Sequence, residues 1–281
     1  MDSLSQYCSP GSTFKEEMVP VSPNVSLRVI TFSPSQPREN PALVFVPGWV
    51  SLMAGWREVL LEMTRDFHVY YIETREKITS KVRGKVDYSL ESIGKEISAL
   101  VSHFSLESRG YILFGSSLGA TAILESSRFL ETDPLCLVLI APNAVFRIPK
   151  FYLFIIRILS PRFYLVLKPV VKWYLKTFRL DTDTDYAQYE KYCHALDAAD
   201  PWKLKKAAIA FSRYEVWNLL ADIDYPTLII GASGDTLHEP ENLKKMASIM
   251  RHAAYLDLET NKLTHSSGMV REMRKYIAQL K

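Results

Sequence analysis

Residues 115–119 place a serine where it could act as a nucleophile. Their sequence, GSSLG, fits the pattern G-x-S-x-G, in which small residues flank a serine on a sharp turn from a strand into a helix. The apolar segment 111–115 precedes the turn, and a segment compatible with a helix follows it. An ordinary turn with packing glycines would look similar, so the interpretation of Ser117 depends on partners elsewhere in the chain.

A serine hydroxyl needs a base within hydrogen-bond reach to become nucleophilic. Of the six histidines, His265 follows the last expected strand and precedes the closing helix, which puts it at the edge of the sheet that displays Ser117. His238 is an alternative, but it lies on the same short loop as the expected acid. We expect it to have trouble reaching Ser117 from there, and we predict His265 as the base.

An imidazole base also needs a carboxylate that fixes its tautomer and stabilises its charged form. Asp235 follows the apolar segment 227–232, so it should lie at the same edge of the sheet as Ser117. Asp222 and Asp224 precede that segment and should lie at the opposite edge. We therefore predict Asp235 as the acid.

The charge that develops on the substrate oxygen during acyl transfer is stabilised by backbone N–H groups. The N–H of Leu118, the residue after the nucleophile, is one expected donor. The other is expected from the loop after the apolar segment 42–48, where Gly48 lets the chain turn and Trp49 follows. Trp49 and Leu118 are thus the predicted oxyanion-hole residues.

The segments that must position these groups alternate between strand and helix patterns. Apolar runs predict buried strands, and periodic segments between them, such as 89–104, predict helices. These runs are 42–48, 67–73, 111–115, 136–141, 227–232 and 253–259. This alternation predicts an α/β fold with a mostly parallel central sheet and helices on both faces. Residues 145–220 contain no convincing strand and are interpreted as a helical insertion over the carboxyl edge of the sheet.

The order Ser117, Asp235, His265, together with the strand that ends in VPGW and the segment PTLIIGASGD, resembles the alpha/beta-hydrolase superfamily. The resemblance implies that residues 1–144 and 221–281 form a hydrolase core and that 145–220 form a helical cap. Two motifs depart from those of the family. Pro47 precedes Gly48 where the family often has histidine, and ETREKITS follows the fourth strand where the family often has D-x-R-G-x-G-x-S.

Composition excludes several other classes of protein. The 281 residues are 48% hydrophobic and 23% charged, with a net charge of +3, which is typical of a soluble globular protein and does not indicate a nucleic-acid partner. The three cysteines are odd in number and widely spaced, which suits neither a disulfide framework nor a zinc site. Because the start of the sequence shows no signal-peptide pattern, we predict a cytoplasmic protein. The expected serine chemistry implies no metal or organic cofactor.

The start of the insertion is both apolar and basic. Residues 145–180 carry eight Lys and Arg and no Asp or Glu. Lys168, Lys172, Lys176 and Arg179 are spaced to share one helical face, as in amphipathic helices that lie on anionic membranes. We favour the other interpretation, in which the apolar residues pack on the core and line an apolar pocket while the lysines are solvated. A peripheral membrane contact through 145–180 stays open.

The leading hypothesis is a serine hydrolase that cleaves carboxylic esters or thioesters with apolar groups, through an acyl-enzyme on Ser117. An acyltransferase or a carbon–carbon bond hydrolase with the same triad is an alternative. Dehalogenase and epoxide-hydrolase chemistry is disfavoured, because those relatives carry Asp where this chain has Ser117. The rival of another class is a non-catalytic member of the fold that binds a small apolar ligand.

Overall fold

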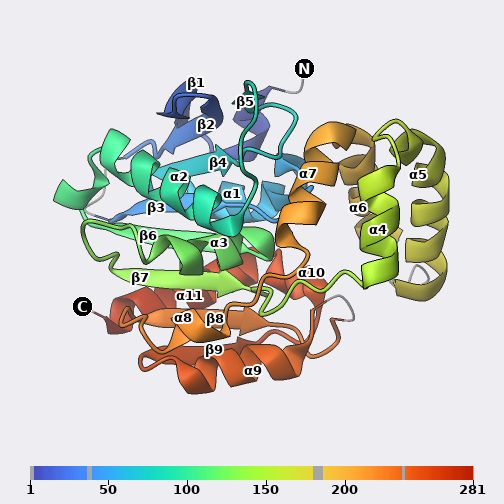
Figure 1. Cartoon of the computed structure of the whole chain (residues 1–281). Coiled ribbons are helices and arrows are strands. Elements are labelled where there is room, and N and C mark those ends of the chain that lie inside the picture. The colour runs from blue at the N-terminus through green and yellow to red at the C-terminus, as the bar shows by residue number, and fades with distance from the viewer. Residues whose placement is uncertain (1–2, 37–39, 180–185, 236–237, 281) are drawn as a thin grey trace.

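The computed structural model describes residues 3–36, 40–179, 186–235 and 238–280, and Figure 1 shows their arrangement. A nine-stranded sheet in the order β1-β2-β4-β3-β6-β7-β8-β9, with β5 paired to β2, runs through them. The strands are β1 Thr13–Ser22, β2 Val25–Ser33, β3 Ala42–Val46, β4 Val69–Glu73, β5 Lys81–Val82, β6 Tyr111–Ser116, β7 Cys136–Ile140, β8 Thr227–Gly231 and β9 Ala253–Asp257. The predicted α/β fold is confirmed.

The centre of the sheet is parallel. β3 pairs in parallel with β4 and β6, and β6–β7, β7–β8 and β8–β9 continue the pattern, whereas β1 and β2 are antiparallel. Every residue of β3, β4, β6, β7 and β8 is buried, as expected for strands covered on both faces. Because parallel strands end at one edge, the loops after β3, β6, β7 and β8 meet there.

Helices cover both faces of the sheet (Figure 1), with α2 and α3 on one face and α1 and α11 on the other. The helices of the core are α1 Arg57–Met63, α2 Leu90–His103, α3 Leu118–Ser126, α8 Trp217–Leu220, α9 Pro240–Ile249, α10 Asn261–Thr264 and α11 Ser267–Gln279. Short 3-10 turns are η1 Leu4–Tyr7, η2 Met53–Trp56 and η3 Leu106–Ser108.

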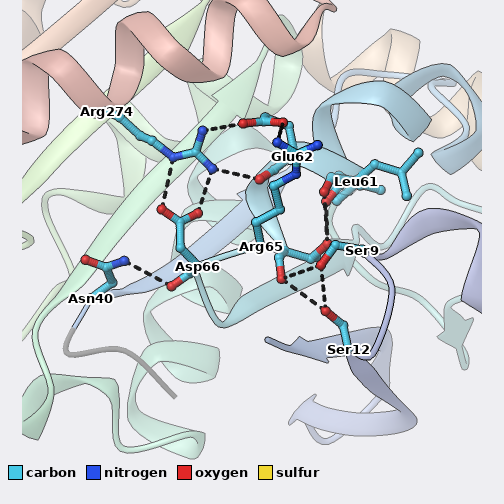
Figure 2. Close-up of polar contacts among 10 residues, drawn as sticks. Ser9, Ser12, Asn40, Leu61, Glu62, Arg65, Asp66 and Arg274 are labelled. Atoms are coloured by element: carbon cyan, nitrogen blue, oxygen red, sulfur yellow. Dashed lines mark hydrogen bonds and ion pairs between the residues drawn. The ribbon is translucent and has the colours of Figure 1, made fainter. Parts of the chain in front are cut away.

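An arginine fastens the closing helix to α1, as Figure 2 shows. The guanidinium of Arg274, on α11, donates to both carboxylate oxygens of Asp66 at 3.0 and 2.6 Å, to a carboxylate oxygen of Glu62 and to the Glu62 carbonyl. Charge-assisted bonds that approach two carboxylates in a fixed fork geometry give strong orientation. The middle of α11 is therefore anchored to α1 and to the turn that follows α1.

Between β7 and β8 the chain forms helices that stand to one side of the sheet (Figure 1). They are α4 Lys150–Ile158, α5 Phe163–Tyr174, the π-helical turn η4 Leu175–Arg179, α6 Tyr186–Ala198 and α7 Pro201–Phe211. At the start of α7 the Asp200 carboxylate accepts the N–H groups of Trp202 and Lys203, and Pro201 is the first helical residue. Both features favour helix initiation. We call α4–α7 with η4 the cap.

Among the described residues, no helix is both long enough and apolar enough to cross a bilayer. The same residues contain no group of three or more His, Cys, Asp or Glu side chains placed to hold a metal ion.

Candidate active site

Ser117 occupies a strained turn between β6 and α3. Its φ is 50° and its ψ is −118°, a conformation that L-residues rarely adopt and that occurs mostly where function requires it. A Cβ atom at Gly119 would lie 2.1 Å from the Val46 carbonyl oxygen, and one at Gly115 would lie 2.8 Å from the Ala120 nitrogen. The two glycines of G-x-S-x-G are therefore required by close backbone approaches.

The Ser117 hydroxyl contacts an imidazole that in turn contacts a carboxylate. Ser117 Oγ lies 3.0 Å from Nε2 of His238, and Nδ1 of His238 lies 2.8 Å from Oδ2 of Asp235. The His238 backbone N–H also donates to Asp235 Oδ1 at 3.3 Å. The three side chains form a continuous hydrogen-bonded series at the carboxyl edge of the sheet.

The expectation that His238 would have trouble reaching Ser117 with Asp235 behind it was wrong. The His238 N–H bonds to Asp235, and the acid contacts one nitrogen of the His238 ring while the other ring nitrogen faces the serine. The spacing D-x-x-H was the sequence signal for this arrangement. Residues 236 and 237, between acid and imidazole, lie outside the described residues.

His265, the expected base, lies in the wall of the same cavity. Its Nδ1 is 3.0 Å from both the Asn261 carbonyl oxygen and the Thr264 hydroxyl, and its ring stacks on Trp56 with centroids 4.1 Å apart. Burial, and next the positive charge of Lys191, lower the pKa of His265 to about 3. Among the hydrogen bonds of the described ranges, Ser117 is joined to His238 and not to His265. The assignment of His265 as the base stays a prediction, and the contact of His238 with Ser117 makes His238 the alternative base.

The expected oxyanion donors flank the nucleophile. Leu118 is the first residue of α3, and the N–H groups of a first helical turn have no partner within the helix. On the other side, the loop that contains Trp49 packs against the elbow, since a Cβ at Gly48 would lie 3.3 Å from Cβ of Ser117. Trp49 lies in the cavity wall with Ser117, and Leu118 follows Ser117 directly; their role as oxyanion donors stays a prediction.

Asn143 is a polar neighbour of Ser117 that the sequence did not indicate. The Ser117 hydroxyl lies 2.8 Å from its side-chain oxygen. The Asn143 backbone N–H donates to the hydroxyl of Thr121 on α3, and that hydroxyl lies 3.0 Å from the Asn143 carbonyl oxygen and 3.1 Å from that of Ser117. A lone asparagine after a strand carries no pattern that would have singled it out.

A cavity of about 600 Å³ opens between the cap and the sheet edge. Ser117, His238 and His265 lie in its wall on the core side. On the cap side the lining is mostly aliphatic and aromatic and includes Ile155, Leu159, Tyr164, Leu167, Val171 and Leu204. Pockets with an apolar lining and a few convergent polar groups are typical small-molecule sites.

The chain was compared with known proteins. Neither a scan against models of protein families nor a search of curated proteins finds a match. Solved structures do match: a hydrolase from Pseudomonas aeruginosa PA01 is 17% identical with a TM-score of 0.75, and the match covers 95% of this chain and 98% of that one. A thermophilic esterase from Thermogutta terrifontis is 16% identical with a TM-score of 0.75, covering 95% and 99%.

An alpha/beta hydrolase from Sphaerobacter thermophilus is 18% identical with a TM-score of 0.70, and the match covers 92% of this chain and 99% of that one. At such identities the likeness concerns the fold and not the substrate. Together with the parallel sheet and the elbow, it shows that the chain has the alpha/beta-hydrolase fold.

Proposed function

We propose that the chain is a serine hydrolase that cleaves carboxylic esters or thioesters with apolar groups through an acyl-enzyme on Ser117. The observation that carries the proposal is the continuous series Ser117–His238–Asp235, with distances of 3.0 and 2.8 Å, in the wall of an apolar cavity. The solved structures described as a hydrolase and an esterase support hydrolysis as the reaction class.

In the first half-reaction, Ser117 Oγ attacks the carbonyl carbon while an imidazole takes its proton. His238 is the better placed imidazole, because Nε2 faces the hydroxyl and Asp235 accepts from Nδ1. The negative oxygen of the tetrahedral intermediate is held by the N–H groups of Trp49 and Leu118. The imidazolium then protonates the departing alcohol or thiol, and a water molecule resolves the acyl-enzyme by the same steps in reverse.

Asn143 competes for the serine proton in the resting site. The hydroxyl has one proton, so it donates either to the Asn143 oxygen or to His238. For attack, the Ser117 hydroxyl must donate its proton to the imidazole. The Asn143 amide can then stabilise Oγ only by donating to it, with its side-chain nitrogen turned toward Oγ. Asn143 thus helps to fix the direction of the hydroxyl.

The cavity lining determines the class of substrate. Its aliphatic walls favour an apolar acyl or alcohol part, because polar groups buried there would lose their hydration without a partner. A series of p-nitrophenyl esters of graded acyl length should show kcat/KM rising with length until the cavity is filled. A profile without any preference for apolar esters would contradict the proposal.

Two experiments separate this reaction from its rivals. A fluorophosphonate probe should label Ser117, whereas a non-catalytic ligand-binding member of the fold should not react. Adding competing alcohols or thiols to the ester assay distinguishes an acyltransferase, which would form new esters or thioesters at the expense of free acid.

A separate observation favours a membrane partner for the cap. On α4 and α5, large apolar side chains spaced three or four residues apart are more than half exposed, namely Phe151, Phe154, Ile158, Val166, Val170 and Trp173. Their spacing gives each helix one outward apolar stripe. Contiguous exposed apolar surface of this kind marks an interaction site.

The cations around this surface favour an anionic bilayer as its occupant. Lys150, Arg157, Arg162 and Lys176 are exposed, and residues 145–180 contain no acidic residue. The expected basic face of α5 is only partly available, because Lys168 and Lys172 both pair with Asp197 of α6; the Arg179 side chain lies outside the described residues. We propose that the outward stripes of α4 and α5 insert among lipid headgroups while these cations attract anionic lipid.

Sedimentation with vesicles tests the membrane contact. Binding to vesicles with phosphatidylserine should exceed binding to phosphatidylcholine vesicles at low salt, and Val166→Asp with Trp173→Asp should remove it. Leu135→Asp is the matched control, since Leu135 is half exposed outside the cap. Equal binding by all variants would overturn the proposal, and so would a dimer that the cap variants dissociate.

A further inference from the structure

A buried lysine reaches the loop that carries the proposed oxyanion donor. Lys77 follows β4, and its side chain is only 8% exposed. Its Nζ donates to the Gly48 carbonyl at 2.6 Å and to the Ser51 carbonyl at 2.9 Å. Lys77 belongs to the segment ETREK, in which the sequence departs from the family motif.

The two carbonyls belong to the ends of one strained turn. The Ser51 N–H donates to the Gly48 carbonyl at 3.1 Å, and Val50, the third residue of this turn, has a φ of 60°. A positive φ is a genuine outlier for a β-branched residue. Such a conformation costs on the order of 1–3 kcal/mol and persists only where the surroundings hold it. Lys77 bonds to both ends of the turn and thereby opposes its relaxation.

The Gly48 carbonyl and the Trp49 N–H are parts of the same peptide group. That group is planar and trans, so its C=O and N–H point in opposite directions. An ammonium that fixes the carbonyl therefore also fixes the N–H, which points away from Lys77. The positive charge of the Lys77 ammonium beside the carbonyl oxygen also polarises the peptide group and strengthens its N–H as a donor.

The charge on Lys77 has a partner beside the turn. Glu76 Oε1 lies 3.8 Å from Nζ, and the same oxygen accepts the Thr74 hydroxyl at 2.7 Å. Burial lowers the pKa of Lys77, whereas the carboxylates of Glu76 and Glu73 oppose that shift. A buried ammonium with two carbonyl acceptors and a carboxylate neighbour satisfies the general requirement for burying a charge.

We propose that Lys77 is a positioning residue that aims the Trp49 N–H at the oxyanion by holding the Gly48 carbonyl. This inference rests on the proposed serine-hydrolase function. It predicts an effect on the transition state and not on substrate binding, because the oxyanion exists only after Ser117 has attacked.

Steady-state kinetics of Lys77→Met with a p-nitrophenyl ester test the inference. We expect kcat to fall about 10- to 100-fold with KM changed less than about threefold. The loss should be smaller than the roughly 10²- to 10³-fold that removal of an oxyanion donor itself causes, because the Trp49 N–H is still present. Inhibition by an aryl boronic acid, whose serine adduct mimics the tetrahedral intermediate, should weaken by a similar factor. A merely structural role would not lower kcat and boronate affinity together while leaving KM in place.

Lys203→Met is the matched control. Lys203 also donates to two backbone carbonyls, those of Lys77 and Ser80 at 2.5 and 2.6 Å, but neither belongs to the oxyanion turn. We expect its kcat to stay within about twofold of the unchanged protein. If Lys77→Met keeps full kcat and boronate affinity, the inference is wrong. If Lys203→Met, which loosens the Lys77 main chain but keeps the Lys77 ammonium, loses as much, the main chain and not the ammonium sets the rate, and the inference is also wrong.

Two further variants keep the test decisive. If Lys77→Met does not fold, Glu76→Gln combined with Lys77→Met removes both members of the buried pair, and the same kinetic loss is expected relative to Glu76→Gln alone. Ser117→Ala separates a failure of the serine-hydrolase function from a failure of the role of Lys77. If Ser117→Ala keeps its turnover, the serine-hydrolase function fails; if it is inactive while both Lys77 variants keep kcat, only the role of Lys77 fails.

Discussion

The helix that follows the nucleophile and the helices of the cap are both rich in apolar residues, but they place them differently. Every residue of α3, Leu118–Ser126, is buried, whereas α5 buries none of its twelve residues and α4 buries only Leu153. Other parts of the same chain cover the apolar side chains of α3 on every side. In α4 and α5 one stripe faces the cavity and another faces outward.

This contrast separates the part of the molecule that fixes the position of Ser117 from the part whose outer surface can change without affecting the site. The position of Ser117 is fixed by backbone contacts around α3, so it should tolerate almost no change. The side chains of the outward stripes of the cap are more than half exposed and lie away from the cavity, so changes there should leave chemistry on a soluble ester intact.

The strongest effect is expected from Ser117→Ala. It removes the attacking oxygen and should reduce ester turnover about 10³-fold or more, while the melting temperature stays near its original value. Turnover assays and thermal melts check this. Activity that survives the change would show that the nucleophile lies elsewhere.

Gly119→Ala tests the rigidity of the elbow. Its Cβ would lie 2.1 Å from the Val46 carbonyl oxygen, so we expect a loss of about 3 kcal/mol in the free energy of unfolding, or failure to fold. Gly84→Ala is the control, because a Cβ at Gly84 would meet open space and only its φ of +64° is unfavourable. Urea denaturation of both variants should rank them in this order; equal losses would contradict it.

The two histidines should differ in their effect on turnover. His238→Ala removes the imidazole that contacts Ser117, so kcat should fall at least 10²-fold. His265→Ala removes a ring that stacks on Trp56 and bonds to Asn261, and we expect a loss of about tenfold or less. The opposite ranking in steady-state assays would assign the base to His265.

The lowered pKa of His265 predicts a pH dependence of stability. Its pKa is about 3 in the folded protein and about 6.5 in an unfolded chain. Between these values the unfolded state binds the proton and the folded state does not. The free energy of unfolding should therefore fall as the pH drops below about 6.5, by at most about 1.4 kcal/mol per pH unit from this group. His265→Gln should show a shallower slope in denaturation curves between pH 7 and pH 5.

The weakest effect is expected on the outer surface of the cap. Val166→Asp should leave kcat/KM for a short soluble ester within about twofold, because Val166 points outward and is 71% exposed. Leu167→Asp is the comparison, because Leu167, next to Val166 in the chain, lines the cavity. This variant should lower kcat/KM for longer esters. Equal losses would show that the two stripes of α5 are not functionally distinct.

The parts of the fold that could be predicted are those that depend on local sequence. The apolar runs predicted the central strands because strands such as β3 and β7 are buried on both faces. The Ser117 elbow was also recognisable, because its glycines are needed by contacts within a few residues of the turn or with the neighbouring strand. The resemblance to the alpha/beta-hydrolase superfamily also used the order Ser117, Asp235, His265 and the segments VPGW and PTLIIGASGD.

What could not be predicted depends on contacts between distant segments. The position of His238 depends on the bond between its N–H and Asp235, a contact that the spacing D-x-x-H permits but does not require. The lysines of α5 formed a periodic pattern, but Asp197 of α6 pairs with two of them. Lys77 and Asn143 contact residues that follow other strands, so nothing in their own stretch of sequence indicated a role.

The outward stripes of α4 and α5 also have a practical consequence for handling the protein. In plain buffer at high concentration, such surfaces tend to cover one another, and molecules would cluster through their caps. The apparent mass should then rise as the stock is concentrated and fall again when a mild detergent is added. Purification in the presence of amphiphile is therefore the preparation that suits this molecule.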